Sequence, residues 1–320
     1  MGFDVITMGR ISVDVYPQQV GVSLREVESF GKFLGGSSTN VAVAAARYGR
    51  RVATITRTGN DPFGLFLHDA LQGFDVDDRW VTAVDGLPTP LAFCEIFPPD
   101  HFPLYFYREP KAPDLEIHTH ELDLDAIREA RVFWATVTGL SQEPSRSATL
   151  TALEASEGIT VLDLDWRPMF WPSRDEGRKW VREALRFADV AVGNEDEWET
   201  AGDDVHVDLM VRKRGPRGTF ARRGDESVDV PPAPVEVVNG LGAGDAFGGA
   251  LCHGLLSDWD LERMIRFANA AGAIVAGRLA CADAMPTADE VQAASSRSAL
   301  ACSGEDSPDG SPSRRNEGET

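Results

Sequence analysis

The chain has 320 residues, of which 42% are hydrophobic and 26% are charged, and its formal net charge is −20. So acidic a surface excludes general binding to the phosphate backbone of nucleic acids and docking on anionic membranes. No apolar run approaches the roughly 20 residues that span a bilayer, and no basic segment typical of a signal peptide precedes residues 5–8, so we expect a cytoplasmic protein.

Short apolar runs alternate with helical stretches along most of the chain. Residues 5–8 predict a buried strand, residues 36–48 an alanine-rich helix, and residues 52–55 a second strand. Further strands are expected at residues 132–135, 160–163, 188–192 and 209–211. This alternation favours βαβ units, and therefore an α/β fold with a mainly parallel sheet and helices on both faces.

Two segments, residues 15–34 and 88–114, lack helical periodicity. The second contains strand-like runs at residues 91–97 and 104–107, separated by a Pro-Pro-Asp turn. We expect both segments to form a small β-sheet that stands off the main domain as a lid. Because exposed sheet edges can pair with another chain, a homodimer through the lid is one possibility. The domain is expected over residues 1–294, followed by a disordered tail of polar composition at residues 295–320.

The strongest local signal is the glycine-rich run at residues 240–247, which leads into a helical stretch. Such a turn presents free backbone N–H groups and the positive end of a helix dipole, which together bind anions. Asp245 in the first turn would be an ionised carboxylate beside a phosphate-sized hole, able to take a proton from an attacking hydroxyl. A flexible turn with an ordinary helix-start acid explains the spacing equally well. The other phosphate-binding motifs are absent.

Polar residues also follow other predicted strands. Gly35 and Gly36 allow a ligand close to the backbone, and Asn40 can bind hydroxyls, although a tight turn with a Ser or Thr cap explains the pattern too. Asp14 lies just past the first strand, where ligands bind in open α/β sheets. Asn194 and Glu197 suit phosphate and Mg²⁺, or equally a helix capping box.

Three basic positions have two readings each. Lys213 opens a turn at residues 213–218 that suits nucleotide phosphates or forms an exposed hairpin loop. Arg108 and Arg167 have aromatic neighbours and suit carboxylate recognition, or each makes a structural ion pair. The pair His118 and His120 has no further ligand nearby, and the four cysteines contain no close pair, so no zinc site is expected.

Taken in order, these segments resemble the ribokinase/PfkB family of carbohydrate kinases, over residues 3–292. The resemblance implies a three-layer α/β/α fold with a β-sheet lid, and the use of ATP and Mg²⁺. The roles it implies are a catalytic base at Asp245, an anion hole at Gly242, Ala243 and Gly244, sugar contacts at Asp14, Gly35, Gly36 and Asn40, phosphate and metal contacts at Asn194 and Glu197, and a nucleotide side at Lys213, Gly215, Gly218 and Asn269.

Within that family, residues 9–14, 106–115, 239–245 and 278–286 resemble the branch that phosphorylates 5-dehydro-2-deoxygluconate in myo-inositol catabolism. Because that substrate is a sugar acid, Arg108 and Arg167 are expected to neutralise its carboxylate. Asn239-Gly240 stands where many relatives have Asp-Thr, which weakens the case for potassium activation. Kinases of 2-dehydro-3-deoxygluconate, fructose or nucleosides, and a non-catalytic sugar-binding protein, remain alternatives.

Overall fold

The computed structural model describes residues 2–202 and 204–303. Its main sheet is nine-stranded, in the order β13-β12-β11-β10-β9-β8-β1-β4-β5. Neighbours are parallel from β11 to β5, whereas β12 and β13 extend one edge as antiparallel strands. The strands are β1 (Val5–Met8), β4 (Val52–Gly59), β5 (Val76–Val84), β8 (Val132–Thr136), β9 (Ile159–Asp163), β10 (Val190–Asn194), β11 (Leu209–Lys213), β12 (Thr219–Arg223) and β13 (Glu226–Val230). The predicted, mainly parallel sheet is confirmed.

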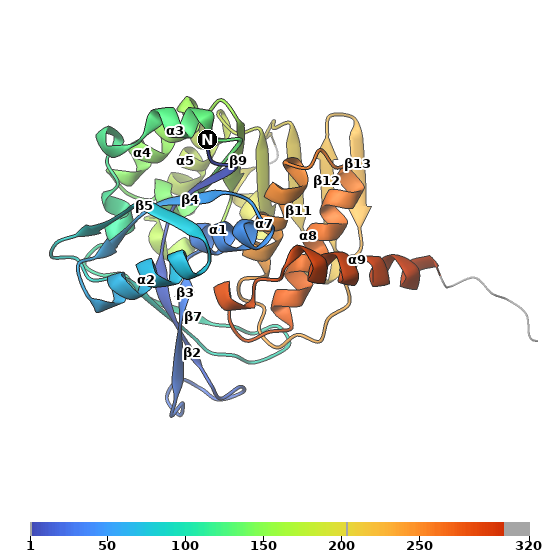
Figure 1. The fold of residues 1–320 in the computed structure, drawn as a ribbon, viewed down its shortest axis with the longest axis horizontal. Helices are drawn as coiled ribbons and strands as arrows, with labels where there is room; N and C mark the ends of the chain where they lie inside the picture. Colours follow the sequence, from blue (N-terminus) through green and yellow to red (C-terminus); the bar gives the residue numbers. More distant parts are fainter. Residues whose placement is uncertain (1, 203, 304–320) are drawn as a thin grey trace, which may run out of the picture.

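Helices cover both faces of this sheet (Figure 1). Successive strand residues point to opposite faces, so Val5 packs in one hydrophobic cluster and Ile6 in the other. One cluster includes α1 (Ser37–Arg47), α2 (Pro62–Gly73), α7 (Ala243–Leu255) and α8 (Leu261–Ala276). The other includes α3 (Leu124–Glu129), α4 (Ser145–Ala155), α5 (Arg174–Leu185) and α6 (Glu195–Ala201). The strands are apolar on both sides because both sides are buried, and the predicted three-layer fold is confirmed.

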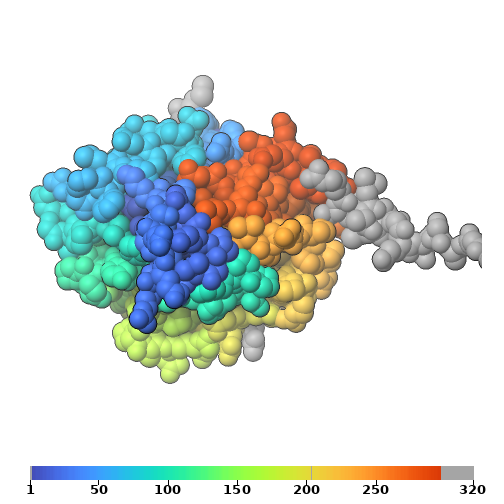
Figure 2. Space-filling view, turned by 90° about the horizontal axis from the view of Figure 1, so that it is seen from below, coloured from blue at the N-terminus to red at the C-terminus, as the bar shows by residue number. Residues whose placement is uncertain are grey.

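A second, four-stranded sheet, here called the small sheet, projects from the main body (Figure 1). Its order is β3-β2-β6-β7, with bounds Phe30–Gly35, Ser12–Pro17, Leu91–Cys94 and Leu104–Tyr107. The β2–β6 pair is parallel and the other pairs are antiparallel. Seen from below, its blue segment lies beside the orange C-terminal part, and its blue-green segment lies beside the yellow part (Figure 2). These strands come from the two segments that lacked helical periodicity, although β2 begins at Ser12.

A disordered tail was predicted over residues 295–320. Helix α9 runs from Ala288 to Ser303, so residues 295–303 are helical, and residues 304–320 lie outside the described residues. At its start, the amide of Thr287 donates to Glu290 at 2.8 Å, which is half of a capping box. The alanines of residues 288–303 favour helix.

The topology brings the ends of several strands to one edge of the main sheet. β1 leads directly into β2 of the small sheet, and β9, β10 and β11 end at Asp163, Asn194 and Lys213. Because parallel strands share their carboxyl-end edge, polar residues that follow them gather beside the small sheet. Along the part of the chain that the structure describes, no helix has the length and apolarity to cross a bilayer.

Candidate active site

The glycine-rich turn leads into α7 and shapes its first turn. Gly242 is the N-cap with a φ of 80°, a left-handed conformation that favours glycine. A Cβ atom built on Gly242 would lie 2.7 Å from Sγ of Cys281. Just before the turn, the buried side chain of Asn239 accepts from the amide of Leu241 at 3.1 Å. The first amides of a helix have no intrahelical acceptor, so this turn offers N–H groups and a positive dipole end to an anion.

Asp245 lies in the first turn of α7, half-buried, and lines a narrow cavity. Its Oδ2 accepts a hydrogen bond from Nδ2 of Asn40 at 2.8 Å. Removal from water raises the pKa of Asp245 to about 7, and the charge of Asp165 adds to the rise, while the Asn40 hydrogen bond and the charges of Arg10 and Lys213 oppose it. A carboxyl group that titrates near neutral pH is suited to accepting a proton during a reaction.

The cavity lies between the small sheet and the carboxyl-end edge of the main sheet. It measures about 50 Å³, which is less than a six-carbon sugar acid fills. Asn40 leaves its buried Oδ1 without a partner among the described residues, so this atom is free to accept from a ligand hydroxyl. The lining residues are Arg10, Asp14, Tyr16, Gly36, Ser37, Asn40, Ala92, Leu104, Phe106, Arg167, Leu241, Gly242, Asp245 and Cys281.

Asp14 is held in the cavity wall by its own strand. Its Oδ1 accepts from Ser12 Oγ at 3.0 Å and its Oδ2 from Tyr16 Oη at 2.9 Å. Burial raises the pKa of Asp14 to about 6, against the lowering effect of those two hydrogen bonds. Gly35 on the neighbouring strand makes room for this carboxylate, since a Cβ atom there would lie 1.9 Å from Oδ1. The glycine pair predicted to serve a ligand thus has a packing reason as well.

Of the two arginines expected to meet a carboxylate, the structure brings only Arg167 to the cavity. Its Nη2 is 2.7 Å from Oδ1 of Asp165, and its buried Nε has no partner among the described residues. Arg108 does not line the cavity, because its Nη2 donates to both oxygens of buried Asp114 at 2.9 and 2.8 Å. These contacts correspond to the alternative given for Arg108, a structural ion pair.

The prediction missed Arg10, Ser37, Tyr16 and Cys281, which also line the cavity. Tyr16 connects two of these side chains, since its Oη lies 2.7 Å from Sγ of Cys281. Position could have identified Arg10, because it follows the end of β1 and so lies outside the carboxyl end of a parallel strand. Asp14, four residues further along the chain, was predicted from the same position.

A second cavity, of about 600 Å³, adjoins the other side of the first turn of α7. Lys213, Gly215, Gly218 and Asn269 all line it, together with an apolar wall that includes residues 232–235. Asn269 on α8 fixes this wall, since it accepts from Thr219 Oγ1 at 2.7 Å and donates to the carbonyl of residue 231 at 3.0 Å. The residues predicted for the nucleotide side are therefore brought together in one space.

The start of α7 separates the two cavities. Asp245 and Gly242 line the narrow one, whereas Ala243 and Gly244 line the wide one. Lys213 lies over the same turn, because a Cβ atom on Gly244 would be 3.2 Å from its Nζ. Burial lowers the pKa of Lys213, but the surrounding carboxylates, with Glu197 the strongest, hold it above its ordinary value. A fixed positive charge therefore stands where the cavities meet.

Asn194 and Glu197 form a helix cap and line neither cavity. The Asn194 amide donates to Glu197 Oε2 at 2.6 Å, and the Glu197 amide donates back to Asn194 Oδ1 at 3.0 Å. Among the described residues, no three His, Cys, Asp or Glu side chains converge to hold a metal by themselves. Burial nevertheless raises the pKa of Asp163, against the charge of Lys213, and the charges of Asp165, Glu197 and Asp245 add to the rise. Such mutually repelling acids fit a divalent cation whose other ligands are phosphate and water.

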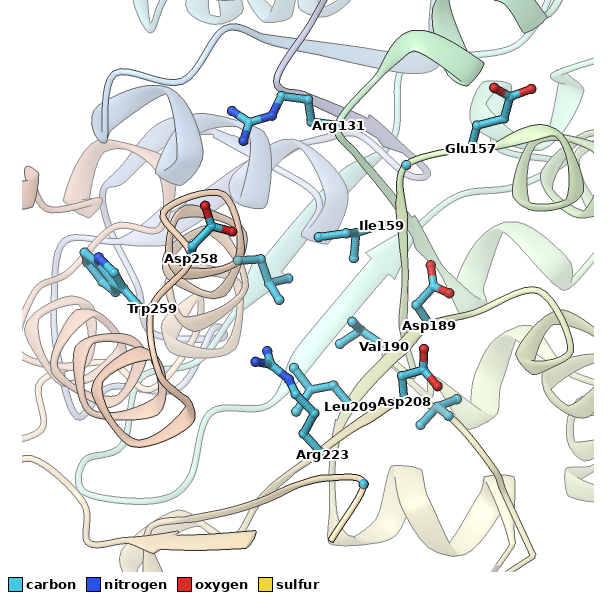
Figure 3. A pocket seen from close by; sticks show the side chains of 14 residues that line it. Arg131, Glu157, Ile159, Asp189, Val190, Asp208, Leu209, Arg223, Asp258 and Trp259 are labelled. Atoms are coloured by element: carbon cyan, nitrogen blue, oxygen red, sulfur yellow. The ribbon is translucent and has the colours of Figure 1, made fainter. Parts of the chain in front are cut away.

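A larger hollow, of about 1140 Å³, lies at the opposite edge of the main sheet (Figure 3). Its wall includes Ile159, Val190 and Leu209, which are the first residues of β9, β10 and β11. Figure 3 shows Arg131 and Arg223 spread around it among several carboxylates. None of the residues predicted for the site lines this hollow, so size alone does not locate the chemistry.

Known proteins resemble this chain along nearly its whole length. The pfkB family carbohydrate kinase profile matches residues 3–288. A 5-dehydro-2-deoxygluconokinase of Listeria monocytogenes is 32% identical over 310 residues, covering 91% of this chain and 95% of that protein. A 5-dehydro-2-deoxygluconokinase of Geobacillus thermodenitrificans is 30% identical over 311 residues, covering 90% of this chain and 92% of that protein.

Solved structures share the same architecture. An uncharacterized sugar kinase from Pyrococcus horikoshii in complex with ATP has a TM-score of 0.80 and 26% identity, covering 91% of this chain and 99% of that chain. A fructokinase with bound ATP from Xylella fastidiosa has a TM-score of 0.82 at 24% identity, covering 92% and 99%, and shows the fold alone. The ribokinase-like fold and the kinase prediction are confirmed. The chain belongs to the pfkB family of carbohydrate kinases.

Proposed function

We propose that this kinase transfers the γ-phosphoryl group of ATP to the terminal hydroxyl of 5-dehydro-2-deoxy-D-gluconate, in the cytoplasm, as a step of myo-inositol catabolism. One observation carries the proposal of phosphoryl transfer at this site. The first turn of α7 divides a narrow polar cavity from a wide, partly apolar one, and exposes a carboxylate to the first and backbone amides to both. The relatives named as 5-dehydro-2-deoxygluconokinases support the choice of substrate.

Asp245 is the proposed base. As the hydroxyl oxygen bonds to the γ-phosphorus, the bond from phosphorus to the β–γ bridging oxygen breaks and ADP leaves, while the hydroxyl proton passes to the carboxylate. The pKa of about 7 keeps a substantial fraction of Asp245 ionised at neutral pH and still gives it real affinity for a proton. Asn40 holds the receiving carboxylate through its 2.8 Å hydrogen bond.

The start of α7 is the proposed anion hole. The amides of Gly242, Ala243 and Gly244 belong to the N-cap and first turn, where the helix dipole favours negative charge. Lys213 adds a full positive charge over the same turn. Fixed donors of this kind stabilise the charge that develops on the equatorial oxygens of the phosphoryl group, and they need no reorganisation during the reaction.

The narrow cavity is the proposed sugar site. Asp14 and the free Oδ1 of Asn40 would accept from sugar hydroxyls, and Gly36 lets the ligand approach the backbone. The nucleotide would occupy the wide cavity, with Lys213, Gly215, Gly218 and Asn269 along its wall. Asn194 and Glu197, with Asp163, would hold Mg²⁺ through water. When bound, Mg²⁺ supplies neutralisation of phosphate charge.

The small sheet is the proposed lid. At about 50 Å³ the sugar cavity is closed to a substrate-sized molecule in this conformation, so entry requires the small sheet to move away from the main sheet. Closure afterwards excludes water, which would otherwise accept the phosphoryl group. The edge strands β3 and β7 carry the exposed aromatic residues Phe30 and Tyr107, which supports a homodimer through the lid as part of this proposal.

Asp245→Asn tests the catalytic assignment. We expect kcat to fall by about 10²–10⁴, the usual contribution of a general base, with the KM for ATP changed less than about threefold. Asp125→Asn, a change of the same kind at a side chain that is 90% exposed, serves as the control. A coupled assay of ADP release measures both. Turnover of the Asp245 variant within about tenfold of the wild type contradicts the assignment.

A further inference from the structure

Arg10 is a buried cation of the sugar cavity to which the mechanism above gives no role. Only 6% of its surface is exposed, and it lines the cavity with Asp14 and Asp245. It lies in the short connection between β1 of the main sheet and β2 of the small sheet. A buried guanidinium is retained where its donors meet acceptors, so the partners of Arg10 indicate what it binds.

The described partners of Arg10 leave its donors underused. Its Nε and Nη2 lie 3.4 and 3.3 Å from one and the same oxygen, Oδ2 of Asp165, which also accepts from Ser37 Oγ at 2.7 Å. Nitrogen-to-oxygen distances in good hydrogen bonds are about 2.7–3.2 Å. Its Nη1 has no partner among the residues that the structure describes. Arg10 is therefore held in place without being saturated.

One carboxylate also serves two guanidinium groups here. The other oxygen of Asp165 is 2.7 Å from Nη2 of Arg167. Nη1 of Arg167 donates to the carbonyl of Trp166 at 3.1 Å, so the protein holds Arg167 more closely than it holds Arg10. Nη1 of Arg167 also lies 3.9 Å from Oε1 of Glu197, so Arg167 has two carboxylate partners, whereas the ion pair of Arg10 within the described residues involves Asp165 alone. Arg10 is therefore the less firmly paired cation, in a cavity where Asp14 and Asp245 would repel an anionic substrate.

The backbone of Arg10 is fixed from both sides. Ser38 Oγ donates to its carbonyl at 3.1 Å, and a Cβ atom on Gly36 would lie 2.4 Å from that carbonyl oxygen. On the lid side, the Arg10 Cζ lies 5.6 Å from the ring centre of Phe106 on β7. The guanidinium therefore stands at a set position between the main sheet and the proposed lid.

We infer that Arg10 binds the carboxylate of the sugar acid, with Asp165 and Ser37 orienting its guanidinium toward the cavity. The planar group offers two parallel N–H donors to the two carboxylate oxygens, which a lysine ammonium cannot match. The long contacts to Asp165 make this exchange of partners inexpensive. The inference rests on the proposed function, because it requires that the substrate be an acid.

Arg10→Gln is the test, measured on 5-dehydro-2-deoxygluconate and on its carboxamide, which has the same chain without the charge. Hydrogen bonds to charged groups are worth enough that we expect KM for the acid to rise about 10- to 150-fold. We expect the KM for the carboxamide to change less than about threefold, because it makes no charged contact with Arg10. Any change in kcat should be the same on both substrates, because loss of the Arg10 charge raises the pKa of Asp245 whichever substrate is bound. Arg10→Lys keeps the charge and loses the fork, so its KM for the acid should fall between the two.

Arg174→Gln is the matched control, since it removes one positive charge from α5 at a side chain that is 39% exposed and outside the cavity. It should leave the preference for the acid unchanged. A thermal melt of each variant checks folding. If Arg10→Gln does not fold, the acid-to-carboxamide ratio of Arg10→Lys decides, and a ratio equal to that of the wild type overturns the inference.

The outcomes separate this inference from the proposed function. A wild-type enzyme that shows no preference for the acid over the carboxamide refutes the acid substrate, and with it both proposals. A wild-type preference that Arg10→Gln retains overturns the role of Arg10 and leaves the proposed function standing. An equal rise in KM on both substrates also overturns it, because Arg10 would then act on a part that the two substrates share or on the fold.

Discussion

Replacing Asp245 by Asn should stabilise the ligand-free enzyme, by an amount that grows with pH. The pKa of Asp245 is raised from 3.8 to about 7, chiefly because the folded protein removes its carboxylate from water. The native state therefore holds this proton where the unfolded chain has released it. Stability from this group is present below about pH 4, and it is lost as the pH rises from there to about 7. Asparagine carries no charge, so the variant avoids the loss.

The structure sets the size of the effect. Each unit of pKa shift corresponds to 1.36 kcal/mol, so a rise of about three units is worth about 4 kcal/mol once Asp245 is fully ionised. Because the carboxylate keeps some contact with solvent through the cavity, this is an upper value. Between pH 5 and pH 7, the difference in unfolding free energy between variant and wild type should widen by about 2 kcal/mol, and above pH 8 it should be nearly constant.

Urea unfolding at several pH values between about 5 and 8 measures this difference directly. Asp125→Asn, at an exposed position, should show no pH-dependent gain. A stability gain of Asp245→Asn that is the same at every pH would refute the reasoning, because a constant gain comes from packing or hydrogen bonding and not from a buried charge. A pH-dependent loss would show that the carboxylate is stabilised by its cationic neighbours.

Two further substitutions test the surroundings of the site. Gly35→Ala places a Cβ atom 1.9 Å from Oδ1 of Asp14. Overpacking of this kind costs about 1–3 kcal/mol, so the melting temperature should fall and the KM for the sugar should rise. An unchanged KM for the sugar would argue against Asp14 as a sugar ligand. Arg108→Gln leaves buried Asp114 without its ion-pair partner, which should lower the unfolding free energy in a urea titration by about 3–5 kcal/mol. The KM for the sugar acid should change less than about threefold. A large rise in that KM at unchanged stability would indicate that Arg108 contacts the substrate.

Local patterns were sufficient to predict the layers of the fold. The apolar runs at the positions of β1, β8 and β10 are continuous because the sheet is covered on both faces, and such runs are visible without any tertiary information. The end of the domain was harder to place. In α9, helix-favouring alanines are mixed with serines that also suit a flexible tail, and the composition alone does not decide between them.

Spacing in the sequence indicated the site only where its residues are close together, and the resemblance to a family supplied distant members such as Asn269. The turn at Gly242 can be recognised from its glycine-rich run, and the cap between Asn194 and Glu197 from their spacing of three residues. The contact of Arg10 with Asp165 joins residues 155 positions apart, and the one between Asn40 and Asp245 joins residues 205 apart. No spacing rule applies over such separations. The pairing of Arg10 with Asp165 therefore becomes visible only in the folded structure.

The properties proposed for Asp245 also explain why the ligand-free site is costly to the fold. Asp245 titrates near neutral pH chiefly because it is removed from water, and the same removal subtracts folding free energy at working pH. The protein cannot relieve that cost by adding a close cation at Asp245, because a firm ion pair would lower the pKa and weaken the base. Arg10 and Lys213 oppose the shift from a distance, and the one direct partner is the uncharged amide of Asn40. The expected gain of stability and loss of turnover in Asp245→Asn are therefore two measurements of one arrangement.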